Sequence, residues 1–98
     1  MIGHIYIYRE GDREIVAKSL EFNMNKSNTE IIEAYNDACT LGFVGVHRQA
    51  LSVIALNIAF NKRFGKSPIR VTDNTLIEFT GAILLINNDW IYESILKN

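Results

Sequence analysis

Residues 45–64 read GVHRQALSVIALNIAFNKRF, and this segment sets the architecture expected for the chain. Wound as a helix, it places apolar side chains around most of its circumference and confines the polar ones to a narrow stripe. A helix of this kind is covered by other elements on most sides. Gly65 follows the last apolar position, as is typical of a helix end. The sequence therefore predicts a central helix at about residues 45–64.

A second helix is expected immediately before it, at about residues 28–41. Ser27 is followed three residues later by Glu30, the spacing of a capping box. The apolar residues that follow recur every three or four positions and share one face. Gly42 comes directly after the last of them and predicts the end of this helix. The two helices are expected to pack against each other.

Strands are expected on both sides of this pair. Residues 4–10 and 15–24 alternate apolar and polar side chains around a turn at Gly11, which predicts an N-terminal β-hairpin. Pro68 forbids helix continuation, and three short strands are predicted at the ranges 75–80, 82–86 and 90–94. Asn87, Asn88 and Asp89 form a hairpin turn signal. A competing interpretation makes residues 90–97 a terminal helix.

Residues 83–86 form a continuous apolar run, which is typical of a strand buried on both faces. The expected fold class is therefore α+β, with an N-terminal β-hairpin, two packed central helices and a C-terminal antiparallel β-meander of two or three strands. The helices would cover one face of an antiparallel sheet. With 98 residues, the chain 1–98 is expected to form a single domain.

The composition of the chain indicates the cellular compartment in which it works. The single cysteine, Cys39, cannot form an internal disulfide, which favours a reducing compartment. Residues 1–10 lack the basic and apolar regions of a signal peptide. The longest apolar-rich stretch, 43–60, contains five polar residues that lipid would penalise. We therefore expect a cytoplasmic protein that does not span a membrane.

No catalytic, cofactor or metal site is predicted. Cys39, the only thiol, falls on the apolar-facing half of its helix and is interpreted as a buried structural residue. His4 and His47 have no cysteine or histidine at metal-ligand spacing. His47 is interpreted as a polar group of the first helical turn rather than as a general base, because no partner is visible. Residues 63–67 end in Gly-Lys-Ser but lack the first glycine of a phosphate loop.

Charge is distributed unevenly along the chain. Residues 38–72 contain five basic residues and no acidic one, whereas residues 73–98 contain four acidic residues and one basic residue. An acidic surface with aromatic anchors can cover a basic cleft, so the C-terminal segment is the predicted partner-binding region. The residues assigned to it are Asp73, Glu78, Asp89, Trp90, Tyr92 and Glu93. The alternative interpretation for Trp90 is a core residue.

The basic segment raises the alternative of a nucleic-acid-binding module, since Lys62, Arg63, Lys66 and Arg70 cluster around one helix end. Basic residues at a helix C-terminus also complement its dipole. A sequence pI near 6.1 argues against nucleic acid as a direct partner.

Four segments together resemble a group of small bacterial immunity proteins of contact-dependent growth inhibition systems. They are Gly42–Leu51 (GFVGVHRQAL), Arg63–Ile69 (RFGKSPI), Phe79–Gly81 (FTG) and Asn88–Trp90 (NDW). The resemblance spans roughly residues 30–93. It implies a cytosolic protein that binds and blocks a toxin domain delivered by a neighbouring cell, often a nuclease that cleaves transfer RNA. Such families share no catalytic motif, so it transfers no residue role. The alternative is a non-enzymatic interaction module or a homodimeric structural subunit.

Overall fold

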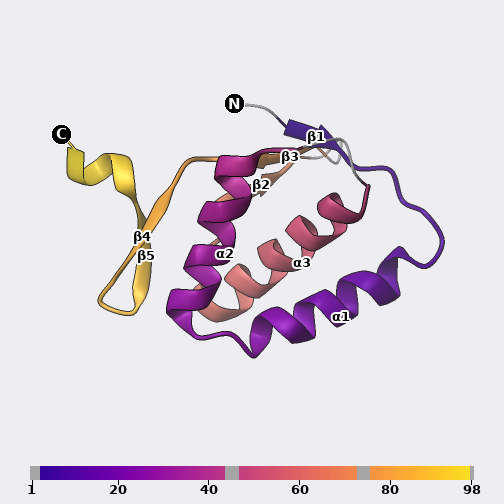
Figure 1. Cartoon of the computed structure of the whole chain (residues 1–98), viewed down its shortest axis with the longest axis horizontal. Helices are drawn as coiled ribbons and strands as arrows, with labels where there is room; N and C mark the ends of the chain where they lie inside the picture. Colours follow the sequence, from indigo (N-terminus) through magenta and orange to yellow (C-terminus); the bar gives the residue numbers. More distant parts are fainter. Residues whose placement is uncertain (1–2, 44–46, 73–75, 98) are drawn as a thin grey trace.

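The chain folds into three helices and two small antiparallel sheets, an α+β architecture that confirms the expected class (Figure 1). The structure is a computed structural model, and it describes residues 3–43, 47–72 and 76–97. In chain order the elements are β1 (Gly3–Ile5), α1 (Asp12–Met24), α2 (Asn28–Leu41), α3 (His47–Phe64), β2 (Ile69–Val71), β3 (Leu76–Phe79), β4 (Ile83–Ile86), β5 (Asp89–Tyr92) and the 3-10 helix η1 (Glu93–Lys97).

The central helix is confirmed. α3 runs from His47 to Phe64, within the predicted range, and is buried along most of its length. The predicted residues 45 and 46 lie outside the described part. Aromatic rings tie α3 to its neighbours: the Phe60 ring lies 5.8 Å from that of Tyr35 on α2 and 6.4 Å from that of Trp90 on β5. These edge-on contacts place α3 at the centre of one apolar core.

The second helix is confirmed with the predicted bounds. α2 spans Asn28–Leu41, and its first turn forms the capping box: the Glu30 amide donates to Ser27 Oγ at 3.1 Å, and the Ser27 amide donates to Glu30 Oε1 at 2.8 Å. Gly42 ends the helix with a φ of 72°, a value that glycine adopts without steric cost.

The predicted N-terminal hairpin is wrong. Residues 15–24, expected as its second strand, belong to α1, and β1 pairs instead with β3. The side chains of α1 that turn inward recur at helical spacing: Asp12 and Asn23 are buried, and the pairs 15–16 and 19–20 between them are half-buried. The alternation of Leu20, Phe22 and Met24 suggested a strand, but Phe22 and Met24 are exposed. Packing of this helical face against α3 outweighs local strand propensity.

The C-terminal strands lie close to the predicted positions, but their pairing is not a single meander. β3 is the middle strand of a sheet with the order β1-β3-β2, and β4 pairs only with β5. Strand β2 was not predicted. The turn between β4 and β5 is confirmed, because Asn87 and Asn88 both have positive φ, as a tight hairpin turn requires. The terminal segment follows both interpretations in part: it is a strand to Tyr92 and a 3-10 helix from Glu93.

In Figure 1 the two sheets lie apart. The three-stranded sheet lies behind the helices, and the β4–β5 hairpin projects at the left beyond α2, with η1 above it. Within the described ranges, no helix is long and apolar enough to cross a bilayer.

Candidate functional site

The β4–β5 hairpin is attached to the rest of the fold by one face. The side chains of Ile83 and Trp90 are buried in the core, and Leu85 packs against it. Asn36 of α2 fastens the first residue of β4: its Nδ2 donates to the Ile83 carbonyl at 2.8 Å, and its Oδ1 accepts from the Ile83 amide at 2.9 Å. The inner face of the hairpin is therefore fixed against α2.

The outer face of the same hairpin is apolar and partly exposed, with Leu84 and Ile91 half-buried. In the β4–β5 register, Leu84 pairs with Ile91 and Ile86 pairs with Asp89, and these side chains point away from the core face because successive residues alternate. Ile86 is 38% exposed. η1 adds Ile95 and Leu96, which are 60% and 59% exposed. We call Leu84, Ile86, Ile91, Ile95 and Leu96 the apolar hairpin face.

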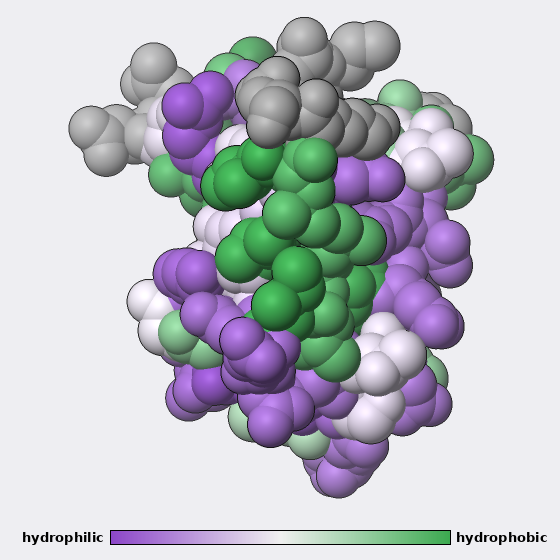
Figure 2. All heavy atoms as spheres, turned by 90° about the vertical axis from the view of Figure 1, so that its left-hand side faces the viewer, coloured by the Kyte–Doolittle hydropathy of each residue, from purple (hydrophilic) through white to green (hydrophobic). Residues whose placement is uncertain are grey.

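Figure 2 views the molecule from the side that carries this hairpin and shows a band of apolar atoms bordered by hydrophilic ones. A two-stranded ribbon is at best marginally stable in water, and a contiguous exposed apolar patch marks an interaction site. The geometry is that of a sheet with one face packed on its own core and the other available to a second molecule.

Two of the predicted partner-binding residues border this face. Asp89 shares the outer side of the hairpin with Ile86, and its Oδ2 lies 3.3 Å from Lys66 Nζ. Glu93 is half-buried at the start of η1. These carboxylates are placed as the polar edge of the apolar hairpin face.

Three of the other four lie away from this surface. Trp90 is buried against Phe60, which is the core interpretation of this residue. Tyr92 points to the inner side, where its hydroxyl lies 2.7 Å from Thr80 Oγ1. Glu78 belongs to β3, in the other sheet, and pairs with Arg70 at 3.3 Å. The fourth, Asp73, lies outside the described residues.

Three of the four clustered basic residues make intramolecular contacts. Lys66 lies 4.6 Å above the Trp90 ring in addition to its pair with Asp89, and Arg70 is paired with Glu78. The Arg63 guanidinium donates to the carbonyls of Lys26 at 2.6 Å and Met24 at 2.9 Å. Arg63 thereby joins the last turns of α1 and α3. These contacts give the basic residues structural roles and do not form a phosphate-binding row.

A cluster around Asp12 was not predicted from the sequence. The buried Asp12 Oδ2 accepts hydrogen bonds from the Tyr6 hydroxyl at 2.8 Å and the Arg9 amide at 2.8 Å, and it lies 2.9 Å from His47 Nε2. The Tyr6 and His47 rings stack with their centroids 5.6 Å apart. One carboxylate thus joins the N-terminal segment, α1 and α3. Asp12 and His47 are 35 residues apart, so no local signal could reveal the pair.

Burial and hydrogen bonding act on the pKa values of this cluster. Burial alone would raise the pKa of the Asp12 carboxyl, but the hydrogen bonds from Tyr6, Arg9 and His47 outweigh it and lower that pKa. Burial, with the hydrogen bond to Asp12, raises the pKa of Tyr6 to about 12. The carboxylate stays ionised and the phenol neutral over the physiological range.

The Asp12–His47 pair resembles the base and its orienting group in nucleophilic enzymes. In the described part of the chain, however, no hydroxyl or thiol is bonded to the His47 imidazole, and Cys39 is half-buried on α2. No group of three or more histidine, cysteine or acidic residues in that part could hold a metal ion. We therefore interpret the cluster as structural: it holds the N-terminal segment and α1 against α3.

The chain matches no protein-family model, no curated protein and no solved structure among those compared with it. The functional argument therefore depends on the geometry of the apolar hairpin face.

Proposed function

We propose that this protein is an immunity protein, which binds a toxin domain of a contact-dependent growth inhibition system in the cytosol and so neutralises it. The observation that carries the proposal is the apolar hairpin face, a partly exposed sheet surface whose opposite side is already fixed to the core. The resemblance of residues 42–51, 63–69, 79–81 and 88–90 to such immunity proteins names the class of partner.

The layout of this surface suits a protein partner. Specific interfaces have an apolar centre and a polar rim, and charge at the rim accelerates association. Here Ile86 and Leu96 belong to the apolar part, and Asp89 and Glu93 lie at its border. A transfer-RNA-cleaving nuclease must hold a polyanion and therefore carries basic surface. Its domain would be steered by the carboxylates and bound through the apolar side chains.

The direct test is co-expression with the polypeptide encoded immediately upstream, followed by affinity purification and a growth-rescue assay. We expect a one-to-one complex and rescue for the wild type, and loss of both for Ile86→Glu combined with Leu96→Glu. The matched control is Ile7→Glu. Ile7 is 72% exposed and belongs to the segment between β1 and α1, at the right in Figure 1 and away from the hairpin. A complex that survives the double change would exclude this face as the contact.

Charge-reversal variants test the acidic rim of the apolar hairpin face separately from its apolar centre. We expect Asp89→Lys combined with Glu93→Lys to slow association with the toxin domain, since rim charges act mainly on the association rate. Glu78→Lys, on the other sheet, is the comparison. If this single change slows association as much as the double change, the acidic contact extends over both sheets.

The second candidate is a homodimeric interaction subunit. It is favoured by the ion pair of Asp89 with Lys66, which partly offsets the charge at the edge of the same surface and leaves an apolar patch that can meet its own copy. Light scattering over a range of protein concentrations distinguishes the two. A dimer in the absence of any toxin, lost in the Ile86→Glu and Leu96→Glu double variant, would favour self-association.

A further inference from the structure

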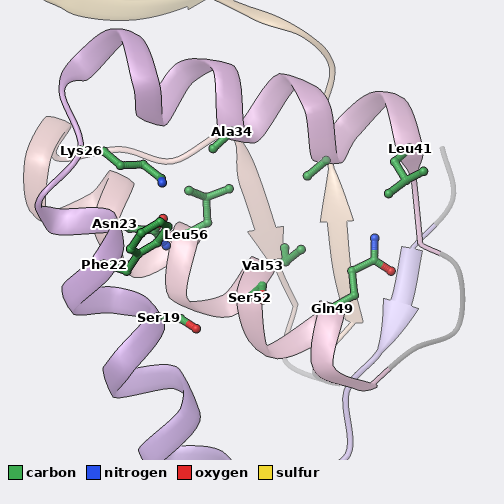
Figure 3. Close-up of a pocket in the computed structure, with 11 residues that line it drawn as sticks. Ser19, Phe22, Asn23, Lys26, Ala34, Leu41, Gln49, Ser52, Val53 and Leu56 are labelled. Carbon is green, nitrogen blue, oxygen red and sulfur yellow. The ribbon is translucent and has the colours of Figure 1, made fainter.

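A groove separates α2 from α1 and is floored by α3 (Figure 3). It has a volume of about 330 Å³, room for roughly ten water molecules in the liquid. The three helices meet where Arg63 donates to the Met24 carbonyl at the end of α1 and to the Asn28 side chain at the start of α2, and α2 then leads away from α1 (Figure 1). The groove is the wedge that this divergence leaves open, on elements other than the β4–β5 hairpin.

All three helices contribute to the wall. Ser19, Phe22 and Asn23 line the groove from α1, and Lys26 lines it from the connection that follows this helix. α2 lines the groove from Ala34 to Leu41 and α3 from Gln49 to Leu56, which is seven positions, two helical turns or about 10 Å in each case. On α3 the lining positions are i, i+3, i+4 and i+7, so one face of this helix is presented to the groove.

The groove is apolar at its floor and at its rims. Val53 and Leu56 are buried beneath it. Phe22 and Leu41 stand on opposite sides and are 67% and 68% exposed. Large apolar side chains that are this exposed at both rims would be covered by a partner that extends beyond the groove, more than by a small molecule confined within it.

Charge in the groove has one sign. Among the described residues that line it, Lys26 is the only charged one, and Figure 3 shows its ammonium turned toward the space beside Phe22 and Leu56. Its Nζ lies 3.7 Å from the centroid of the Phe22 ring. Within the described residues, no carboxylate lies at ion-pair distance from this ammonium, and its electrostatic partner is Glu30, whose pKa is lowered mainly by the Ser27 hydrogen bonds and in part by Lys26. An apolar groove with one cation at its end is complementary to an amphipathic partner that carries an acidic residue.

We propose that this groove binds an amphipathic helix of a partner protein. The helix would present apolar side chains at i, i+3 or i+4, and i+7, and an Asp or Glu at the end that reaches Lys26. Helices bind grooves between other helices by inserting side chains of this spacing, and the two-turn walls match it. This binding site is independent of the apolar hairpin face and of the toxin.

The probes are two lactam-bridged, fluorescein-labelled helical peptides. Each has leucine at i, i+4 and i+7, and they differ only in a terminal glutamate or lysine. By fluorescence anisotropy we expect the glutamate peptide to bind about fivefold more tightly than the lysine peptide, the scale of one exposed ion pair. Lys26→Glu should reverse this preference, and Phe22→Glu should abolish binding of both peptides.

The control is Lys18→Glu, which makes the same charge change at an exposed position of α1 outside the groove. Circular dichroism and thermal melts establish that each variant is folded. Binding of neither peptide to the wild type, or an equal response to Lys26→Glu and Lys18→Glu, overturns the proposal. Dodecanoate is titrated in parallel. If it saturates the groove while both peptides fail to bind, the occupant is an aliphatic anion and the helix proposal is wrong.

Discussion

Replacing Tyr35 with phenylalanine removes one oxygen atom from the centre of the fold and tests how α2 holds the two sheets together. The Tyr35 side chain is fully buried. Its hydroxyl donates to the Gly81 carbonyl at 2.8 Å, lies 3.3 Å from the Pro68 carbonyl and accepts from the Thr80 amide at 3.3 Å. These three groups belong to the segments that leave α3 and connect β3 to β4, so one hydroxyl joins α2 to both sheets.

The expected cost follows from these bonds. A buried polar group that loses its partner costs about 1–3 kcal/mol, and the shorter bond to Gly81 should dominate. We therefore expect Tyr35→Phe to lower the free energy of unfolding at pH 7 by about 2 kcal/mol. For a chain of this size that lowers the melting temperature by roughly 10 °C. Tyr8→Phe, at an exposed position, is the control and should stay within about 0.5 kcal/mol of the wild type.

A pH series makes the test specific to the hydroxyl. Burial, and then the neighbouring Cys39, raise the pKa of Tyr35 from 10.0 to about 12. In the unfolded chain the phenol ionises first, so its stabilising contribution is complete below pH 10 and declines as the pH rises toward 12. A two-unit shift corresponds to about 2–3 kcal/mol. The wild type should therefore lose its advantage over Tyr35→Phe across this interval, while Tyr6, present in both proteins, affects them equally.

The assay is urea unfolding followed by circular dichroism, at pH 7 and at intervals between pH 9 and 12. The decisive quantity is the difference in unfolding free energy between the wild type and Tyr35→Phe. Either of two results would refute the reasoning: a difference below about 0.5 kcal/mol at pH 7, where surface substitutions fall, or a difference that stays constant above pH 10.

Three further changes test the other contacts. Asp12→Asn should destabilise the protein at pH 7. The difference in stability from the wild type should disappear as the pH falls below about 4, because the lowered pKa of Asp12 adds stability only while the carboxyl is ionised. Thermal melts from pH 2.5 to 7 measure this difference, and a difference that is unchanged in acid contradicts the prediction. Ser27→Ala should cost about 1 kcal/mol in urea unfolding, and no loss would mean that the capping box contributes nothing. Arg63→Met should lower the free energy of unfolding by about 2 kcal/mol or more, since the carbonyls of Met24 and Lys26 lose a charged donor. Arg63→Lys, which keeps a charged donor, should recover part of this loss. Equal unfolding free energies for the two variants would contradict this explanation.

The parts of the fold that the sequence predicted correctly are those whose causes lie within a few residues. Ser27 and Glu30 satisfy each other's amides, so the start of α2 needs no distant partner. The tight turn at Asn87 and Asn88 depends only on residues that tolerate positive φ. These local signals predicted the bounds of α2 and the connection between β4 and β5.

The first hairpin failed because residues 15–24 satisfy two patterns at once. Leu20, Phe22 and Met24 alternate as in a strand, while positions 12, 16, 19, 20 and 23 form one side of a helix. The choice is made by α3, which offers a surface along which the helical side can be buried. That surface exists only once the chain has folded, and the short-range pattern does not contain it.

The predicted acidic surface shows how charge along a chain differs from charge in space. Residues 73–98 contain four acidic residues and one basic residue, whereas residues 38–72 contain five basic residues and no acidic one, which suggested an unbalanced C-terminal face. Folding brings the two groups together, as Asp89 meets Lys66 and Glu78 meets Arg70. Charges separated in sequence partly neutralise each other in the structure, and the feature that remains on the hairpin is apolar.

The apolar run at residues 83–86 predicted more burial than the structure shows for this strand. It predicted a strand buried on both faces, yet the outer face of β4 is only partly covered: Ile83 lies in the core, whereas Leu84 is half-buried and Ile86 is exposed. Ile86 is 38% exposed, so a partner that covers it would bury the remaining part of the side chain and add a fraction of the about 1.5–3 kcal/mol that full burial of an isoleucine contributes. Covering the outer face would give β4 the environment that its composition predicts. The discrepancy therefore supports the proposal that another molecule covers this face of the hairpin.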